Sequence, residues 1–423
     1  MRAVDSASTS AEEDKQGTVR DALAVPAFRR LFIATFLSNT GRWMQMVAVG
    51  VLGWEITGSS AFLGQLIFAQ LFPLAILSLI GGSLADIMDR RLLLVVTQIW
   101  QAVWTLVLAW QLVDGEISEN RLLLLIFVIG LGQGLFAPVF TSALPAISEK
   151  RNLRAAISLN SVQTNASRVV GPAIGGWLTS QFGFAEVFAI NGLAYAFVIG
   201  ALLVTRIPRA GSTARSFSDR IFGGFRLAWR APQVGRPLAL MSLFALLCLP
   251  FIGQLPAIAE QQLGVDSKSP EYGWFYAAFG VGALLGALLV ATVLINADRG
   301  PLVKASLLGF SLSLTWLSFA SSLVVGSAAI FAVGLFYFML PTTLATAWQE
   351  HIDESVRGRV SAIWVLSFGG TVPIANLVAG QVVEITSLQA VLLFGAAAAI
   401  VLGLGFAIRQ GPIVGEELLT QGV

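Results

Sequence analysis

Two arginines stand in the middle of long apolar segments, where a charged side chain needs a partner. Arg42 lies about twelve residues into the first segment and Arg168 about fourteen residues into the fifth. At a rise of about 1.5 Å per residue, both reach the middle of a bilayer, where a charge costs at least a few kcal/mol. No Asp or Glu falls near the middle of any segment, so an anionic group of a bound molecule is one candidate partner. The alternative is that each arginine contacts helix carbonyls and only holds the bundle together.

Amide side chains accompany both arginines along the same segments. Residues three or four apart share one face of a helix, so we predict that these amides line a common pathway with the arginines. The whole predicted pathway contains Asn39, Arg42, Gln45, Gln133, Gln163, Asn165, Arg168 and Gln254. Hydrogen bonding between helices is the commoner role of such amides, and this alternative stays open.

The sequence contains no residue set that suggests catalysis. It has neither a nucleotide-binding glycine-rich loop nor a paired-histidine zinc motif. Its one histidine, His351, and its one cysteine, Cys248, lie far apart along the chain and support no triad, disulfide or metal site. We therefore expect no enzymatic activity, no metal and no cofactor. Transport, if this is the function, must take its energy from a gradient.

The apolar segments themselves predict the fold class. Of the 423 residues, 56% are hydrophobic and 12% charged, and the mean hydropathy is +0.78, whereas soluble domains carry about 25% charged residues. A segment of about 20 apolar residues spans a bilayer. We predict an all-α polytopic membrane protein with twelve transmembrane helices, at 31–54, 62–83, 92–113, 122–144, 155–180, 186–205, 238–259, 272–296, 302–322, 327–348, 360–383 and 389–408.

The distribution of positive charge predicts the orientation of these helices. Among the 26 Lys and Arg residues, only Arg121 and Lys268 fall in loops on one side, and only Arg42 and Arg168 fall deep inside segments. All the others lie on the second side, which the positive-inside rule assigns to the cytoplasm. Both termini of this multi-pass protein are therefore predicted to be cytoplasmic. The formal charge of +2 gives no reason to expect a nucleic-acid partner.

A basic link divides the predicted helices into two groups of six. Between residues 207 and 237, Phe217, Ile221, Phe225 and Trp229 recur at every fourth position with arginines beside them, which is typical of an amphipathic helix on a membrane surface. A regulatory or partner-binding role for this helix is the alternative. The predicted organisation is a cytoplasmic tail at 1–28, an N-terminal six-helix half at 29–206, the linker at 207–237, a C-terminal six-helix half at 238–409 and a tail at 410–423.

A short charged loop after the second segment gives the first family signal. The run from Gly81 to Arg91 reads Gly-Gly-Ser-Leu-Ala-Asp-Ile-Met-Asp-Arg-Arg and resembles the loop 2–3 signature of the major facilitator superfamily. Ile87 and Asp89 depart from the usual arginine and glycine. The resemblance implies two pseudo-symmetric halves that work by alternating access. It also implies a cytoplasmic gate, for which we assign Gly82, Asp86, Arg90, Arg91, Arg357 and Arg359.

A second motif and several short matches narrow the resemblance. Gly171, Pro172, Gly175 and Gly176 resemble the Gly-Pro-x-x-Gly-Gly signature of antiporter members, which implies export and a hinge; close packing of helices is the alternative. In the fourth segment, Gly130 stands where drug–proton antiporters of the superfamily usually have an arginine. Trp54 to Ser59 and the Arg357-Gly358-Arg359 triplet look like the bacterial enterobactin-exporter and macrolide-efflux branch.

The resemblance implies a monomeric, multi-pass secondary transporter in the lipid bilayer of a bacterial inner membrane. Its expected substrate is a siderophore-like or other polar, anionic aromatic molecule, exported by proton antiport. A broad-specificity pump for macrolides or other hydrophobic drugs is the alternative within transporters, with uptake as a third reading. A membrane sensor or assembly partner that transports nothing is the alternative from another class.

Overall fold

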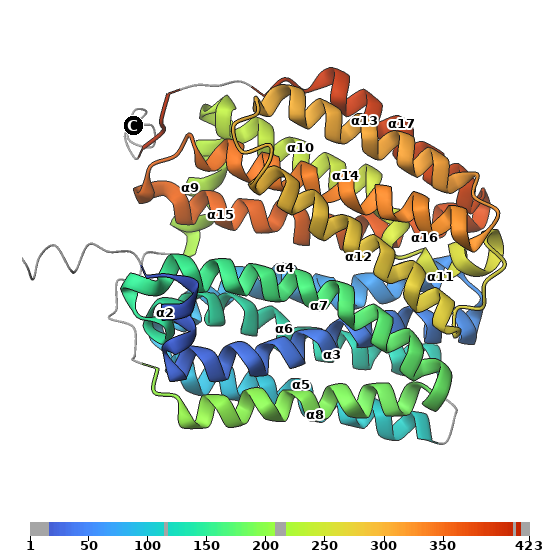
Figure 1. The fold of residues 1–423 in the computed structure, drawn as a ribbon, viewed down its shortest axis with the longest axis horizontal. Helices are drawn as coiled ribbons and strands as arrows, with labels where there is room; N and C mark the ends of the chain where they lie inside the picture. Colours follow the sequence, from blue (N-terminus) through green and yellow to red (C-terminus); the bar gives the residue numbers. More distant parts are fainter. Residues whose placement is uncertain (1–16, 114–116, 208–216, 409–411, 416–423) are drawn as a thin grey trace, which may run out of the picture.

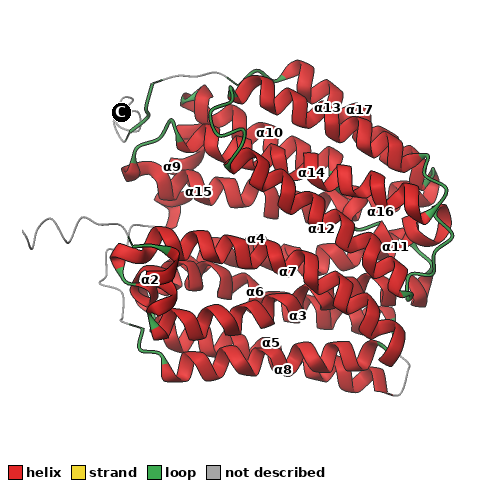
Figure 2. Ribbon diagram, viewed as in Figure 1, coloured by secondary structure: helices red, strands yellow, loops and turns green. Residues whose placement is uncertain are grey.

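The computed structural model describes residues 17–113, 117–207, 217–408 and 412–415 of the chain. Within these ranges, it describes every side chain except those of residues 79–83, 85–87, 150, 217–222 and 354–355. The described part is almost wholly helical (Figures 1 and 2).

Helices cross the molecule from one end to the other, and shorter ones cover its ends. The first bundle, called the N-bundle, contains α3 (Pro26–Thr57), α4 (Ser60–Ile87), α5 (Arg90–Val113), α6 (Glu119–Ser148), α7 (Leu153–Phe182) and α8 (Phe184–Val204). The second, called the C-bundle, contains α10 (Pro232–Cys248), α12 (Pro270–Ala291), α13 (Arg299–Ser318), α14 (Leu323–Gln349), α15 (Glu354–Gly369), α16 (Thr371–Ile385) and α17 (Leu388–Gly405). The shorter elements are α2 (Val19–Ala24), η1 (Lys150–Asn152), α9 (Phe217–Arg230), η2 (Pro250–Ile252), α11 (Leu255–Ala257) and η3 (Ile258–Gln262).

Local sequence signals explain where these helices begin and end. Pro26 opens α3 because the first helical position needs no backbone N–H. Gly58 ends the same helix with a φ of 60°, in the left-handed region that glycine enters at low cost. Ser59 then caps α4, since its hydroxyl accepts a hydrogen bond from the Phe62 N–H at 3.2 Å. The turn between the first two long helices is thus specified by two consecutive residues.

The long helices agree with twelve crossings. Within the described residues, eight helical spans are long and apolar enough to cross a membrane, and one of these, Val356–Ile385, joins α15 and α16. The remaining crossings are α3, α7 and α13, which are less apolar, and α10, which is only 17 residues long. Arg42 lies in α3 and Arg168 in α7. The α9–α10 pair is bent by 108°, so α9 lies across the end of the C-bundle and does not extend α10.

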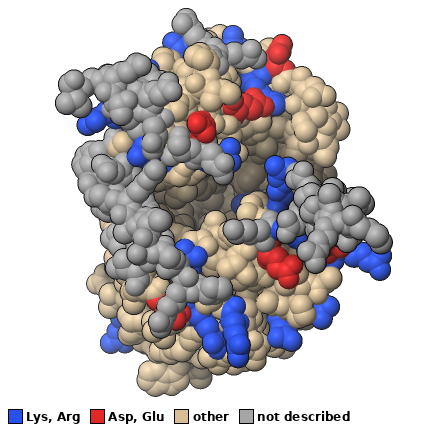
Figure 3. Space-filling model, turned by 90° about the vertical axis from the view of Figure 1, so that its left-hand side faces the viewer, with Lys and Arg blue, Asp and Glu red and all other residues tan. Residues whose placement is uncertain are grey.

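The two bundles lie side by side, with their chain ends at one end of the molecule (Figure 1). We call the end that carries α2, α9 and residues 412–415 the tail face, and the opposite end the far face. Figure 3 looks onto the tail face and shows a hollow at its centre between the bundles, with Lys and Arg side chains around it. Near the far face, in contrast, the bundles touch through α4 with α16 and α7 with α12.

Residues 412–415 return to the C-bundle at the tail face. Val414 forms a parallel bridge with Ile352 in the loop between α14 and α15. Its N–H donates to the His351 carbonyl at 2.8 Å, and its carbonyl accepts from the Asp353 N–H at 2.9 Å. The Val414 side chain is 1% exposed and packs into an apolar cluster with Leu227 of α9. The end of the described chain therefore joins the linker helix to the start of α15.

Candidate functional site

A cavity of about 330 Å³ lies between the two bundles and is lined by both. The N-bundle contributes Arg42, Trp43, Gln45, Met46, Gln70, Leu71, Leu74, Gln101, Ile126, Ile129, Gly130, Gln133, Arg168 and Tyr195, and the C-bundle contributes Ile252, Tyr276, Phe279, Tyr337, Phe338, Phe368 and Val372. Apolar lining with a few polar groups is the usual composition of a small-molecule site. The cavity is therefore the strongest candidate for a binding site in the described part of the molecule.

The wall from the N-bundle supplies the charge and most of the hydrogen-bonding groups. Arg42 from α3 and Arg168 from α7 face the same cavity, together with amides from α3, α4, α5 and α6. The Gln45 carbonyl oxygen accepts a hydrogen bond from the Asn191 amide of α8 at 2.5 Å. This bond fixes the Gln45 side chain, because its partner is itself fully buried. Among the described residues that line the cavity, none is an Asp or Glu.

The wall from the C-bundle is aromatic. Phe279, Tyr337 and Phe338 line it, and the Phe279 and Tyr337 rings stack with their centroids 5.7 Å apart. The charge of Arg168 lies against this wall, since its guanidinium carbon is 4.1 Å from the centroid of the Phe338 ring. The Trp43 ring approaches the same carbon at 5.1 Å. A guanidinium between two aromatic faces is attracted by both rings.

The structure brings together four of the eight predicted pathway residues. Arg42, Gln45, Gln133 and Arg168 line the cavity, and Asn165 stands beside it, where its oxygen accepts a hydrogen bond from Arg168 at 3.3 Å. The other three, Asn39, Gln163 and Gln254, are not among the lining residues.

Two of these three have partners elsewhere. Gln163 of α7 is buried and donates to the Thr35 hydroxyl of α3 at 2.9 Å. Gln254 is also buried and donates to the Ser60 carbonyl, at the start of α4, at 3.2 Å. The second bond connects the two bundles near the far face. In this conformation both amides act in helix packing.

Three further polar links join the bundles at the far face. The Trp54 indole N–H donates to a Glu260 oxygen at 2.7 Å. Lys268 forms an ion pair with Glu55. The Glu384 carboxylate accepts from the Ser59 hydroxyl at 2.8 Å and from the Ala61 N–H at 3.2 Å. Each link joins the first half of the chain to the second, so together they hold this end of the molecule closed. We call them the far-face links.

The predicted gate residues lie at the tail face. Gly82 and Asp86 fall outside the residues whose side chains the structure describes. Arg90 donates to the Ser142 carbonyl of α6 at 3.2 Å, and Arg91 donates to the Leu202 carbonyl at the end of α8 at 2.8 Å. Both of these bonds stay within the N-bundle.

The two gate arginines of the C-bundle lie at the start of α15. Arg357 is exposed and Arg359 is half-buried. A Cβ added at Gly224 of α9 would lie 2.7 Å from the Arg359 carbonyl oxygen. The linker helix thus packs directly on the backbone of α15 beside Arg359.

The glycine-proline motif lies inside α7, which continues through it from Leu153 to Phe182. A Cβ at Gly171 would lie 2.4 Å from the Trp43 Cβ of α3, and one at Gly175 would lie 2.9 Å from the Met44 Cα of the same helix. A Cβ at Gly176 would lie 2.5 Å from the Gly273 Cα of α12. Two glycines therefore let α7 pack within its own bundle, and the third lets it touch the other bundle.

Sequence reasoning missed the tyrosines of this site. The chain has four tyrosines, all within helices that cross the molecule, and Tyr195, Tyr276 and Tyr337 line the cavity. The restriction of tyrosine to these helices is a sequence feature that could have indicated the site. Phe338 gave none, because one phenylalanine among 28 cannot be separated from those that face lipid.

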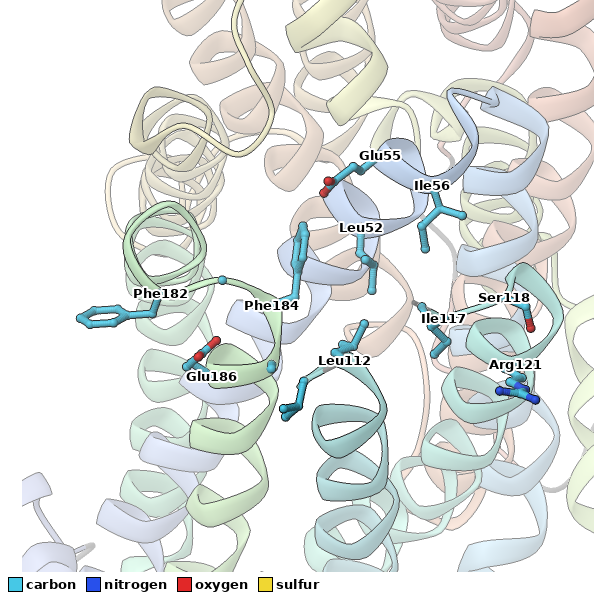
Figure 4. Close-up of a pocket in the computed structure, with 13 residues that line it drawn as sticks. Leu52, Glu55, Ile56, Leu112, Ile117, Ser118, Arg121, Phe182, Phe184 and Glu186 are labelled. Carbon is cyan, nitrogen blue, oxygen red and sulfur yellow. The ribbon is translucent and has the colours of Figure 1, made fainter. Parts of the chain in front are cut away.

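A second depression, of about 910 Å³, lies at the far face of the N-bundle. Glu55, Arg121 and Glu186 contribute its charges. Figure 4 shows that these side chains come from different elements and do not point toward one another. They form no common binding group, so this depression is a weaker candidate than the cavity between the bundles.

Comparison with known proteins agrees with this architecture. Residues 20–415 match the family model described as "Transmembrane secretion effector". The enterobactin exporter EntS of Shigella boydii serotype 18 is 25% identical over 351 residues, which cover 80% of this chain and 81% of the exporter. The EntS of Escherichia coli O139:H28 is 24% identical over 351 residues, with the same shares of the two chains.

Solved structures show the same fold at low identity. The nucleoside transporter NupG has a TM-score of 0.72 and 14% identity, with coverage of 90% of this chain and 98% of NupG. A bacterial homologue of the human lysosomal transporter Spinster, in an inward-facing and unoccupied conformation, has a TM-score of 0.66 and 17% identity, with coverage of 90% and 94%. The D-xylose-proton symporter has a TM-score of 0.70 and 13% identity, with coverage of 88% and 96%.

Proposed function

The chain belongs to the transmembrane secretion effector family of the major facilitator superfamily, and from this premise we propose that it exports a small anionic aromatic molecule across the inner membrane. The solved structures that share its fold are transporters, and the sequence relatives described above bear the name of an enterobactin exporter. A siderophore-like compound is the substrate class that we propose.

The unequal composition of the cavity walls is the observation that supports this substrate class. Arg42 and Arg168 offer two positive charges, while no described residue that lines the cavity offers a negative one. A guanidinium binds carboxylate and other planar anions through paired hydrogen bonds. The opposite wall offers ring faces from Phe279 and Phe338, which attract an aromatic ring. A molecule with an anionic group at one end of an aromatic body fits both walls.

We propose that transport proceeds by alternating access between the two faces. The tail face is proposed to be cytoplasmic, in accord with the predicted side of the basic loops. The hollow there and the links at the far face correspond to a conformation open to the inside (Figure 3). In the opposite conformation, residues 29–206 and 238–409 would tilt as two units about the linker 207–237. Asp86, Arg90, Arg91, Arg357 and Arg359, with Gly82, would then close the cytoplasmic side.

Proton antiport is the proposed source of energy, on the basis of the motif from Gly171 to Gly176 that resembles antiporter members. The same residues are the proposed hinge, together with their packing contacts on α3 and α12. The protein is proposed to work as a monomer in the lipid bilayer.

The test is efflux from vesicles that contain the purified protein under an imposed proton gradient. A catechol carboxylate represents the anionic aromatic class, and a macrolide represents hydrophobic drugs. We expect gradient-driven movement of the catechol carboxylate, lost in Arg42→Ala and Arg168→Ala. Arg121→Ala is the control, because Arg121 is exposed and lines only the depression at the far face. Movement that is indifferent to both cavity arginines would refute the assignment.

Export of hydrophobic drugs is the second candidate function, and the aromatic wall favours it. A macrolide could bind Phe279, Phe338 and Phe368 without using either arginine. Transport of the macrolide alone, unchanged in Arg42→Ala and Arg168→Ala, would support this function in place of the first.

A further inference from the structure

We propose that Phe338 is a positioning residue that couples the bound anion to the movement of the two bundles. Its ring and the Arg168 guanidinium form a contact between the C-bundle and the N-bundle at the depth of the cavity. When an anion pairs with Arg168, this contact weakens, and the bundles can separate toward the far face. The part of the inference that involves the ligand rests on the proposed function.

The position of the contact along the seam between the bundles is the first argument. α7 and α12 touch at two levels. A Cβ at Gly176 would meet the Gly273 backbone near the far face, and a Cβ at Gly280 would lie 2.8 Å from the Arg168 carbonyl oxygen. Gly273 and Gly280 are seven residues apart, or about 10 Å along a helix. Arg168 thus lies on the same seam as the far-face closure, about two helical turns deeper.

The partners of the Arg168 side chain are the second argument. Its guanidinium donates a hydrogen bond to the Asn165 oxygen, one turn earlier on the same helix, at 3.3 Å. The aromatic face that it contacts on the other bundle is the Phe338 ring, at 4.1 Å. A guanidinium keeps five N–H donors, so most of its donors are available to an anion in the cavity.

The charge of the Arg168 guanidinium explains how a bound anion would weaken its contact with the Phe338 ring. Attraction between a cation and a ring face depends on the charge of the cation and grows as water is excluded. An anion that pairs with Arg168 cancels much of that charge at the ring. A ligand shifts a conformational equilibrium only through different affinities for the two states. The loss of the cation–ring attraction supplies such a difference, because it removes a contact present in the closed far face.

The test compares the far-face distance in full-length protein with and without ligand. Spin labels on Ile56→Cys and Ile385→Cys, in a Cys248→Ser background, report this distance from opposite bundles, since both sites are exposed and near the far face. Position 338 is changed to Leu, or to a fluorinated phenylalanine that keeps the ring shape and removes the negative face. Phe368→Leu and the same fluorinated residue at position 368 are controls for the distance measured without ligand, because Phe368 lines the cavity and is not one of the rings over which Arg168 lies.

We expect both changes at position 338 to raise the ratio of open to closed far face in the absence of ligand. The expected rise is roughly 2- to 30-fold, the range of a cation–π contact of ordinary strength. The shift that the catechol carboxylate adds in wild type should then shrink. The inference is overturned if the fluorinated ring at 338 behaves as wild type, or if both positions respond equally.

The two proposals fail in different ways in this experiment. If the catechol carboxylate has no effect on wild type but the ligand-free distances at 338 shift, the proposed substrate is wrong and the coupling contact stands. If wild type responds to the anion and the variants at 338 do not differ from it, the substrate stands and the coupling contact is refuted.

Discussion

Gly176→Ala should force the far face open, because the contact at this position is between two backbones. A Cβ at Gly176 would lie 2.5 Å from the Gly273 Cα and 2.9 Å from its nitrogen, and side-chain carbons essentially never approach closer than 3.0 Å. Gly273 has no side chain that can turn aside. α7 and α12 must therefore separate by at least about 0.5 Å, at the place where the two bundles meet.

The size of the effect follows from the cost of overpacking. Inserting a methyl group into a closely packed contact costs about 1–3 kcal/mol. This cost is absent when the far face is open, since α7 and α12 are apart in that conformation. A bias of this size changes an equilibrium between two states by roughly 5- to 150-fold. Transport should slow, because the closed far face is needed in each cycle.

Spin labels at Ile56 and Ile385 measure the separation, and vesicle efflux measures the rate. Gly200→Ala is the matched control, because it makes the same substitution within α8 where nothing lies within 4 Å of the new Cβ. Gly273→Ala should act in the same direction but less strongly, since its Cβ would lie 3.0 Å from the Gly176 Cα. If Gly176→Ala gives the distances and rates of Gly200→Ala, the seam is not a closure and the reasoning is refuted.

Other regions of the structure yield three more predictions. Glu55→Lys should lower the ratio of closed to open far face by roughly 1.5- to 5-fold, the usual contribution of an exposed ion pair. The double variant Glu55→Lys with Lys268→Glu should restore the wild-type distance, and failure to restore it would contradict the pairing. Val414→Asp should lower the melting temperature, because this side chain is 1% exposed, whereas Ile413→Asp at 72% exposed should not. Hydrogen bonds from the Thr18 backbone and hydroxyl lower the pKa of Asp21, so the cap of α2 is fully formed above the ordinary carboxyl pKa and is lost as the pH falls through the lowered value. Amide exchange at residues 19–24 should rise on acidification, and Asp21→Asn should remove this pH dependence.

The sequence was sufficient for the fold because the bilayer constrains each crossing separately. A run of about 20 apolar residues can do little except span the membrane as a helix. The break between α15 and α16, at Gly369 and Gly370, escaped this reasoning because the apolar character continues through it.

The candidate site could be predicted only where a residue differs in polarity from the segment around it. Arg42 and Arg168 stand out because charge in an apolar segment is costly, and the structure places both at one cavity. Phe338 could not be predicted as a site residue, because phenylalanine occurs both in cavity walls and on surfaces that face lipid. Gln163 and Gln254 look from the sequence like Gln45, yet they bond to Thr35 and Ser60 in helix packing. Which partner an amide meets depends on how the helices are rotated, and composition does not encode this rotation.

The unequal walls of the cavity have a consequence for how such a protein can evolve. Among the described residues that line the cavity, the positive charges lie on the N-bundle wall and most of the aromatic rings lie on the C-bundle wall. Mutations of the ring wall, such as Phe279 to a smaller residue, would alter which body shapes fit while leaving recognition of the anion intact. Mutations in the second half of the gene can then change the range of transported substrates, while the first half retains recognition of the anion.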